Sequence, residues 1–175
     1  MAQRPPLPDC GTVDGQPAGD PINCDSPPPP APFGDPSLMS PSFTPSWAVS
    51  SDFFEFLVAS HRLGHHGFHG RDHWLRVLQN GRLLAAKTGA NLRVVELFAL
   101  LHDSCRENEN ADPLHGHRAA AYARDLRGRW FDATDAEIDL LTLACELHSD
   151  GYTEADITVQ TCWDADRLDL GRVGI

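Results

Sequence analysis

From residue 50 onward, apolar residues recur every three to four positions, which is the period of a helix with one buried face. No stretch of the sequence shows the apolar–polar alternation of a half-buried strand. The pattern therefore predicts an all-α domain, a bundle of about six helices. These helices are expected to begin at Ser50 or Ser51, Arg71, Leu92, Pro113, Asp135 and Asp156.

Several of the predicted helix ends carry capping residues. Thr134-Asp135-Ala136-Glu137 has the sequence of a capping box. Asp112-Pro113 predicts an N-cap followed by a proline in the first helical position. Gly89 is expected to end the second helix, whose inward face would contain Trp74, Leu75, Val77, Leu78, Leu83 and Leu84.

The first 47 residues have a different composition. They contain thirteen of the fourteen prolines, including a run of four at Pro27–Pro30, and few large apolar residues. Such a segment favours extended polyproline conformation and buries too little apolar surface to offset its ordering entropy. We predict a disordered, proline-rich segment over residues 1–47 and one folded domain over residues 48–175. Because the chain ends soon after its last motif, we expect this domain to be short or truncated at its C-terminus.

The charge distribution limits the classes of partner. The net charge is −11, and the fourteen basic residues form no run or stripe, which argues against binding to a long nucleic acid. No signal peptide and no apolar run of roughly 18 residues is present, so we expect no membrane partner. The five cysteines lack C-x-x-C spacing, and we interpret them as reduced thiols. We therefore expect a cytoplasmic protein that could form a homo-oligomer.

The histidines are concentrated in the run His65-His66-Gly67-Phe68-His69-Gly70-Arg71-Asp72-His73. His69 and His73 are four residues apart and Arg76 follows three residues later, so the three side chains can share one helix face. His73 stands among apolar residues, where an imidazole without a partner is costly. We therefore predict that His73 is a ligand, and His69 is a weaker candidate for the same role.

The apolar run of the third predicted helix closes with Leu100-Leu101-His102-Asp103. An imidazole beside a carboxylate at the edge of a core suits a divalent ion such as Mn, Fe, Co, Ni or Mg. The alternative is a polar helix C-terminus, where a histidine interacts favourably with the helix dipole.

Near the C-terminus, Cys162-Trp163-Asp164-Ala165-Asp166-Arg167-Leu168 places two carboxylates on the sixth predicted helix. Residues two apart on a helix point about 200° away from each other, so only one of Asp164 and Asp166 can face a metal. The apolar residues Trp163, Leu168 and Leu170 indicate that this helix is at least half buried.

Taken together, His73, His102-Asp103 and Ala165-Asp166-Arg167-Leu168 resemble the H…HD…D pattern of the HD-domain superfamily of metal-dependent phosphohydrolases. The resemblance covers roughly residues 65–172. It implies a helical bundle that holds one divalent metal ion (Mn, Co, Ni, Fe or Mg). The implied ligands are His73, His102, Asp103 and Asp166, with Asp164 as the alternative for the last position.

Two further histidines match positions that superfamily members use to bind phosphate, donate a proton or hold a second metal. His115 opens the helix after the HD pair, and His148 ends the helix before the last motif. A polar helix end is the alternative for each. His117, two residues beyond His115, is expected to face solvent.

One position departs from the superfamily pattern. Members that cleave nucleoside monophosphates or guanosine tetraphosphate commonly carry a glutamate three residues after the HD aspartate, where this chain has Arg106. An arginine there can hold a phosphate through two parallel N–H bonds. The chain also lacks the H-H-G-Y-P signature of cyclic-dinucleotide phosphodiesterases.

The resemblance implies hydrolysis of a small phosphate ester or anhydride, most often a nucleotide. Asp103 would accept a proton from water, Arg76 or Arg106 would bind the substrate phosphate, and His115 or His148 would protonate the leaving oxygen. Two alternatives remain open. One is a catalytically inactive module that binds a nucleotide or a metal and acts through a partner. The other is a metal hydrolase or oxygenase of non-phosphate substrates, because some superfamily members bind a di-iron pair.

Overall fold

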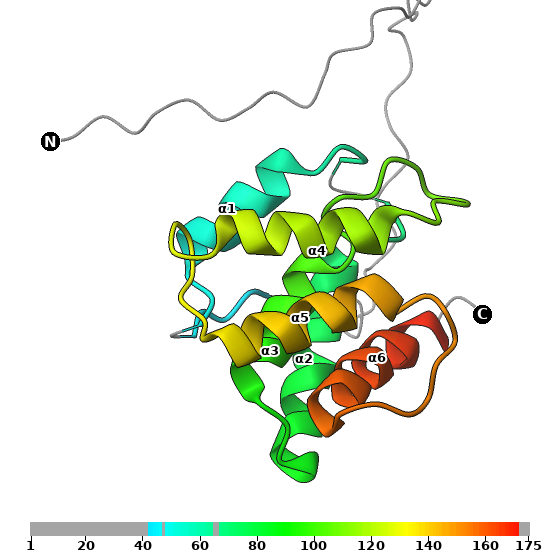
Figure 1. The fold of residues 1–175 in the computed structure, drawn as a ribbon. Coiled ribbons are helices and arrows are strands. Elements are labelled where there is room, and N and C mark those ends of the chain that lie inside the picture. Colours follow the sequence, from blue (N-terminus) through cyan, green and yellow to red (C-terminus); the bar gives the residue numbers. More distant parts are fainter. Residues whose placement is uncertain (1–41, 47, 65–66, 172–175) are drawn as a thin grey trace, which may run out of the picture. The chain divides into compact units, whose positions relative to one another are not determined.

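The computed structural model describes residues 42–46, 48–64 and 67–171. These residues form six helices and no extended strand, which confirms the predicted all-α class (Figure 1). The prediction of disorder for residues 1–41 and 47 lies outside the described part of the chain. The helices are α1 (Ser51–Ser60), α2 (Arg71–Thr88), α3 (Leu92–Leu101), α4 (His115–Leu126), α5 (Asp135–Leu147) and α6 (Ile157–Leu170).

Helix α3 forms the centre of the bundle and contacts each of the other five helices (Figure 1). Eight of its ten residues are buried, because its sequence is apolar on all sides. Its one buried carboxylate, Glu96, is 2% exposed and accepts hydrogen bonds from Arg82 Nε at 2.7 Å and Ser46 Oγ at 2.5 Å. The central helix can therefore carry the HD pair at its C-terminal end into the middle of the domain.

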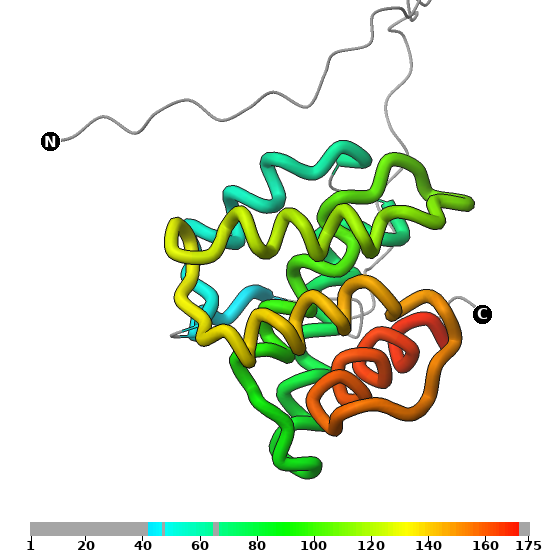
Figure 2. The backbone as a smooth tube through the Cα atoms, in the orientation of Figure 1, coloured from blue at the N-terminus to red at the C-terminus, as the bar shows by residue number. Residues whose placement is uncertain are grey.

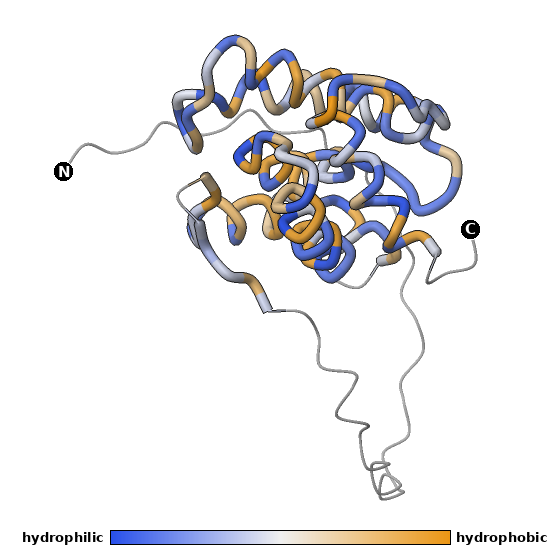
Figure 3. Tube along the Cα trace, turned by 90° about the horizontal axis from the view of Figure 1, so that it is seen from below, coloured by the Kyte–Doolittle hydropathy of each residue, from blue (hydrophilic) through white to orange (hydrophobic). Residues whose placement is uncertain are grey.

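Four of the remaining helices pack around α3 in two pairs, and α1 contacts α3 separately. Helix α2 packs against α6, and α4 packs against α5, which also contacts α6. Figure 2 shows the red α6 beside α5, at the opposite side of α5 from α4. Hydrophobic and hydrophilic residues alternate along the helical coils in Figure 3. None of the described helices has both the length and the apolar character that a bilayer crossing requires.

Most predicted helix ends are confirmed, with one exception. The hydroxyl of Ser50 caps α1, the capping box at Thr134 caps α5, and α2 ends at Gly89 with a φ of 76°, a conformation that suits glycine. The predicted N-cap at Asp112 is wrong, because α4 begins only at His115. The Asp112 carboxylate instead accepts hydrogen bonds within the preceding loop, from the Glu107 N–H at 2.8 Å and from Arg118 Nη2 at 2.5 Å.

The predicted disordered segment is wrong at its C-terminal end. Phe43 stacks on Phe54 of α1 with ring centroids 4.3 Å apart, and Arg82 Nη2 donates to the Thr44 carbonyl at 2.9 Å. Residues 42–46 therefore pack on the helical domain. Proline content alone did not reveal this, because one aromatic ring and a few backbone acceptors are enough to attach such a short segment.

Two leucines that were expected to be buried are instead exposed. Leu83 and Leu168 are each 60% exposed. Leu83 lies two residues after Gly81, where an added Cβ would overlap Val95 Cγ1 of α3, and Leu168 lies two residues after the buried Asp166. Each leucine therefore points about 200° away from an inward position, which is the solvent side. Cys145 and Cys162 are buried in the core, where cysteine packs as a small apolar residue.

Candidate metal centre

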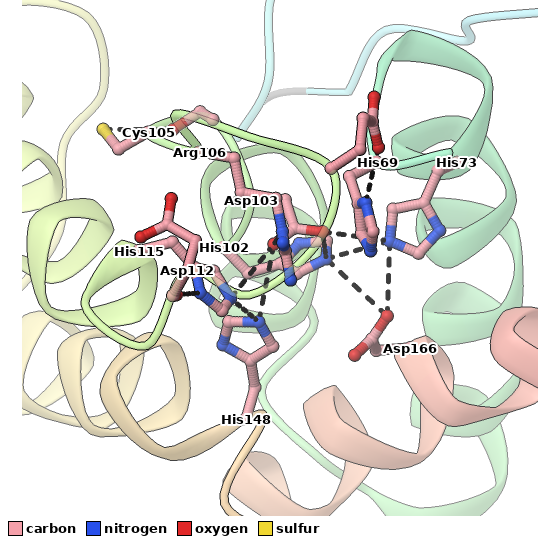
Figure 4. A network of polar contacts seen from close by, with 12 residues as sticks. His69, His73, His102, Asp103, Cys105, Arg106, Asp112, His115, His148 and Asp166 are labelled. Carbon is pink, nitrogen blue, oxygen red and sulfur yellow. Dashed lines mark hydrogen bonds and ion pairs between the residues drawn. The ribbon is translucent and has the colours of Figure 1, made fainter. Parts of the chain in front are cut away.

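The fold brings the three sequence motifs to one buried point at the C-terminal end of α3 (Figure 4). His73 comes from the first turn of α2, His102 and Asp103 follow α3, and Asp166 comes from α6. All four side chains are at most 7% exposed. His73 Nε2 lies 3.1 Å from His102 Nε2, 3.5 Å from Asp103 Oδ2 and 3.3 Å from Asp166 Oδ1.

A second group of donors meets the other oxygen of Asp103. His115, the first residue of α4, and His148, which follows α5, place their Nε2 atoms 2.9 Å apart. These atoms lie 3.3 Å and 3.6 Å from Asp103 Oδ1. Asp103 therefore belongs to two groups of three residues whose donor atoms all lie within 4.8 Å of one another. His102, His148 and Asp166 form a third such group among the described residues.

Hydrogen bonds fix the orientation of all four imidazole rings. Each ring directs Nδ1 at an oxygen that can only accept, so Nδ1 carries a hydrogen and a neutral ring keeps its lone pair on Nε2. The four Nε2 atoms therefore face one another and the carboxylates. The acceptors are the Asp169 carboxylate for His73 and the backbone carbonyls of Phe98, Asp112 and Cys145 for His102, His115 and His148.

This donor set fits a divalent cation. Lone pairs that face each other at 2.9 Å and 3.1 Å require a proton or a cation to offset their repulsion. Metal–ligand distances of about 2.1 Å place neighbouring ligands of one ion roughly 3.0 to 3.4 Å apart. Around His73, the separations of 3.1 and 3.3 Å lie in that range and the separation of 3.5 Å lies just above it.

The electrostatics of the cluster keep its carboxylates ionised. Burial raises the pKa of Asp103, but the facing imidazoles outweigh burial and hold this pKa well below its ordinary value. The pKa of Asp166 is lowered in the same way, against burial, by His73 and His102. Burial lowers the pKa of His102 to about 4, whereas for His73 burial is outweighed by Asp166 and Asp169, which raise its pKa to about 9. Two anionic carboxylates thus lie among imidazoles in a water-poor site, which favours a cation.

Asp169 is a functional residue that the sequence analysis did not identify. Its Oδ2 accepts from His73 Nδ1 at 2.7 Å, and its two oxygens accept from Arg76 Nε at 2.6 Å and Arg76 Nη2 at 3.2 Å. Its position three residues after Asp166, on the same helix face, was the available signal. Arg76 was predicted to bind substrate, but the structure pairs it with Asp169, and it does not line the cavity at the site.

Asp169→Asn is expected to weaken metal binding about 10- to 100-fold, as losses of hydrogen-bond partners to metal-ligating histidines do. An asparagine offers one acceptor oxygen, so either Arg76 or His73 Nδ1 would lose its partner. Competition titration with Mn²⁺ or Co²⁺ measures the change. Asp164→Asn on the same helix is the matched control, since the Asp164 side chain is 61% exposed and should leave the affinity unchanged. Equal affinities for both variants would contradict the role of Asp169.

A cavity of about 220 Å³ opens onto the cluster. Asp103, His148 and Asp166 lie in its wall together with Arg106 and Arg167. Arg106 Nε donates to Asp103 Oδ1 at 2.9 Å, and its Nη1 contacts the backbone carbonyls of residues 108 and 110 at 3.4 Å and 3.3 Å. Arg106 therefore lies at the cavity, as its predicted contact with substrate requires.

The other predicted residues are placed as follows. Asp164, the alternative for the last ligand position, points to solvent, while Asp166 is buried. His117 is exposed, as predicted. His69 is a member of none of the candidate ligand groups, and its Nδ1 instead contacts Glu109 Oε2 at 2.8 Å.

Comparison with known proteins gives one match. A family model described as the HD domain matches residues 70–171, which is more than half of the chain. No curated protein and no solved structure matches. The matched region contains His73, His102, Asp103 and Asp166, and HD domains are typically metal-dependent hydrolases. The protein therefore belongs to the HD domain family.

Proposed function

We propose that this chain is a metal-dependent phosphohydrolase that cleaves a small phosphate ester or anhydride, with a nucleotide as the substrate class that the sequence favours. One observation carries the proposal. Four imidazole Nε2 atoms and two buried carboxylates converge on one another, and Asp103, His148 and Asp166 of this cluster line a cavity together with Arg106 and Arg167. A site that only stabilised the fold would not need this many ligand-type groups directed at one another beside a cavity.

The proposed ligands are His73, His102, Asp103 and Asp166, holding a divalent ion such as Mn, Co, Ni, Fe or Mg. When bound, such an ion supplies Lewis acidity toward a phosphoryl oxygen and lowers the pKa of water. Because the imidazoles keep the pKa of Asp103 low, its carboxylate is better suited to bind a cation than to accept a proton, the role predicted from the sequence.

The chain's own residues bind and orient the phosphate. The guanidinium of Arg106 has five N–H donors, and those on Nη2 have no hydrogen-bond partner among the described residues. These donors can hold phosphoryl oxygens at the cavity wall and offset charge that develops during cleavage. His115 and His148 were predicted to protonate the leaving oxygen. Their Nε2 atoms turn toward Asp103, so we propose that they are ligands for a second cation instead.

The first test is the metal content of the purified protein, together with turnover on phosphate esters and nucleotides in Mn²⁺, Co²⁺, Ni²⁺ and Mg²⁺. We expect one to two divalent ions per chain, and we expect His102→Ala to lose turnover together with the ion held by His73, His102, Asp103 and Asp166. His117→Ala is the matched control, because His117 is exposed and should leave both unchanged. Bound metal without turnover on any phosphate compound would favour the binding-module alternative.

A second candidate function is a di-iron oxygenase. The observation that favours it is the position of Asp103, whose two oxygens face two separate groups of histidines, as a carboxylate that bridges two ions would. Two irons per chain, together with substrate-dependent oxygen consumption, would support this function over hydrolysis. A cytoplasmic location and a homo-oligomer remain predictions from the sequence.

A further inference from the structure

Two loops meet at the rim of the cavity. One joins α1 to α2 and is described at residues 61–64 and 67–70, and the other, here called the HD loop, covers residues 102–114 between α3 and α4. Three contacts tie the loops together: His61 Nδ1 to the Ser104 carbonyl at 3.3 Å, Arg62 Nη1 to Glu107 Oε1 at 3.0 Å, and His69 Nδ1 to Glu109 Oε2 at 2.8 Å.

The third contact differs from the other two because His69 also lines the cavity. A carboxylate can only accept, so His69 Nδ1 donates its hydrogen to Glu109. The His69 side chain is 17% exposed, and in Figure 4 its ring lies beside His73 and Asp103. Its Nε2 has no hydrogen-bond partner among the described residues. The ring is therefore held on one side and open to the cavity on the other.

The absence of a side chain at Gly67 leaves room for the contact between His69 and Glu109. A Cβ atom added to Gly67 would overlap Oε1 of Glu109. The missing side chain at Gly67 therefore lets the Glu109 carboxylate reach His69. The crowded atom is the end of a flexible side chain, so an alanine at position 67 would displace this carboxylate without disturbing the backbone.

We propose that His69, oriented by Glu109, is the proton donor to the leaving oxygen of the substrate, an inference that rests on the proposed hydrolysis. The bond between phosphorus and the leaving oxygen breaks with its electron pair on that oxygen, which takes the Nε2 proton of the His69 imidazolium and leaves a neutral ring with its hydrogen on Nδ1. A water oxygen forms the new bond to phosphorus, and the proton that this water releases restores the imidazolium. A carboxylate that holds Nδ1 serves the same orienting purpose in other acid–base histidines.

The other histidines of the site are less suited to this step. The Nε2 atoms of His115 and His148 lie 3.3 Å and 3.6 Å from Asp103 Oδ1 and 2.9 Å from each other, so they face the cluster. His73 and His102 likewise face Asp166 and Asp103. Among the described histidines at the cavity, His69 alone combines a fixed Nδ1 with an Nε2 outside the ligand groups.

The test compares two substrates of similar size on the metal-loaded protein. Phenyl phosphate releases a phenol with a pKa of about 10, like that of a tyrosine side chain, and so needs a proton donor. 4-Nitrophenyl phosphate releases a much more acidic phenol, so its cleavage depends little on a proton donor. Metal content is measured for every variant, which separates loss of the proton donor from loss of metal.

His69→Asn is the central variant, since its amide can still donate to Glu109 in place of Nδ1 but offers nothing at the position of Nε2. We expect it to lower kcat on phenyl phosphate by about 100-fold, at the lower end of general-acid contributions, and on 4-nitrophenyl phosphate by less than about 10-fold. Glu109→Gln and Gly67→Ala should show the same selective pattern with smaller losses. Arg62→Gln, which breaks the neighbouring loop contact with Glu107, should leave kcat on both substrates unchanged.

Equal losses on the two substrates for His69→Asn, or the selective pattern in Arg62→Gln, would overturn the proton-donor role and leave the proposed hydrolysis standing. Failure of the wild-type, metal-loaded protein to cleave these two esters and every ester and nucleotide of the first test would instead overturn the proposed function, and the proton-donor role with it.

Discussion

Asp103→Asn is expected to abolish stoichiometric metal binding and to lower kcat/KM for the best phosphate substrate by at least about 1000-fold, which corresponds to roughly 4 kcal/mol. The reason is the position of its two oxygens. Oδ2 faces His73 and His102, while Oδ1 faces His115 and His148, so no other described side chain contacts both groups of histidines through separate atoms. An amide nitrogen in place of either oxygen would present N–H donors to groups that need an anion.

The Asp103 variant also needs a check on folding, because Arg106 donates to the same carboxylate. Breaking one partner of a buried ion pair costs roughly 3–5 kcal/mol. Far-ultraviolet circular dichroism and thermal unfolding of the metal-free proteins show whether the helices persist. Arg106→Gln serves as the comparison, since it removes the cation of the pair but leaves every candidate ligand in place. An Asp103→Asn protein that keeps wild-type turnover would refute the assignment of Asp103 as a metal ligand.

The second large effect concerns stability. Gly116→Ala is expected to destabilise the domain by about 1–3 kcal/mol, the usual cost of overpacking. A Cβ at this position would overlap the carbonyl oxygen of Cys145 and lie 3.0 Å from that of Glu146, so α4 and α5 would have to separate. The Cys145 carbonyl also accepts from His148 Nδ1. The substitution should therefore both lower the melting temperature and weaken metal binding.

Thermal unfolding with and without metal measures this effect. Gly171→Ala is the control, because Gly171 has a φ of −54° and no neighbouring atom within 4 Å of an added Cβ. If Gly116→Ala unfolded at the wild-type temperature, the close approach of α4 and α5 would not be needed for the fold.

Much of the architecture was predictable because it depends on local patterns. The 3.6-residue period identified all six helices of the described region, and the residues at Ser50, Thr134 and Gly89 marked their ends. The types and order of His73, His102-Asp103 and Asp166 predicted a common site through their resemblance to the HD-domain superfamily pattern. Helical geometry showed only that one of Asp164 and Asp166 can face inward, and the resemblance favoured Asp166.

The partners of individual side chains could not be predicted in the same way. Arg76 has the charge and the helix face of a phosphate ligand, yet it pairs with Asp169, 93 residues away. Asp112 has the sequence context of an N-cap, but Arg118 and the Glu107 N–H compete for its carboxylate. The Arg76 contact depends on how the chain folds over a long sequence distance, and the Asp112 contacts depend on the path of an irregular loop. Helical periodicity records neither.

The position of α6 near the end of the described chain has a consequence for when the protein can bind its metal. Two of the three carboxylates that reach His73, those of Asp166 and Asp169, come from α6, near the C-terminal end of the described chain. A nascent chain that has emerged from the ribosome only as far as His148, the residue after α5, already carries every histidine of the site but lacks these two anions. Metal loading should therefore be a late event in biosynthesis, taking place after α6 has been synthesised and has docked on α2.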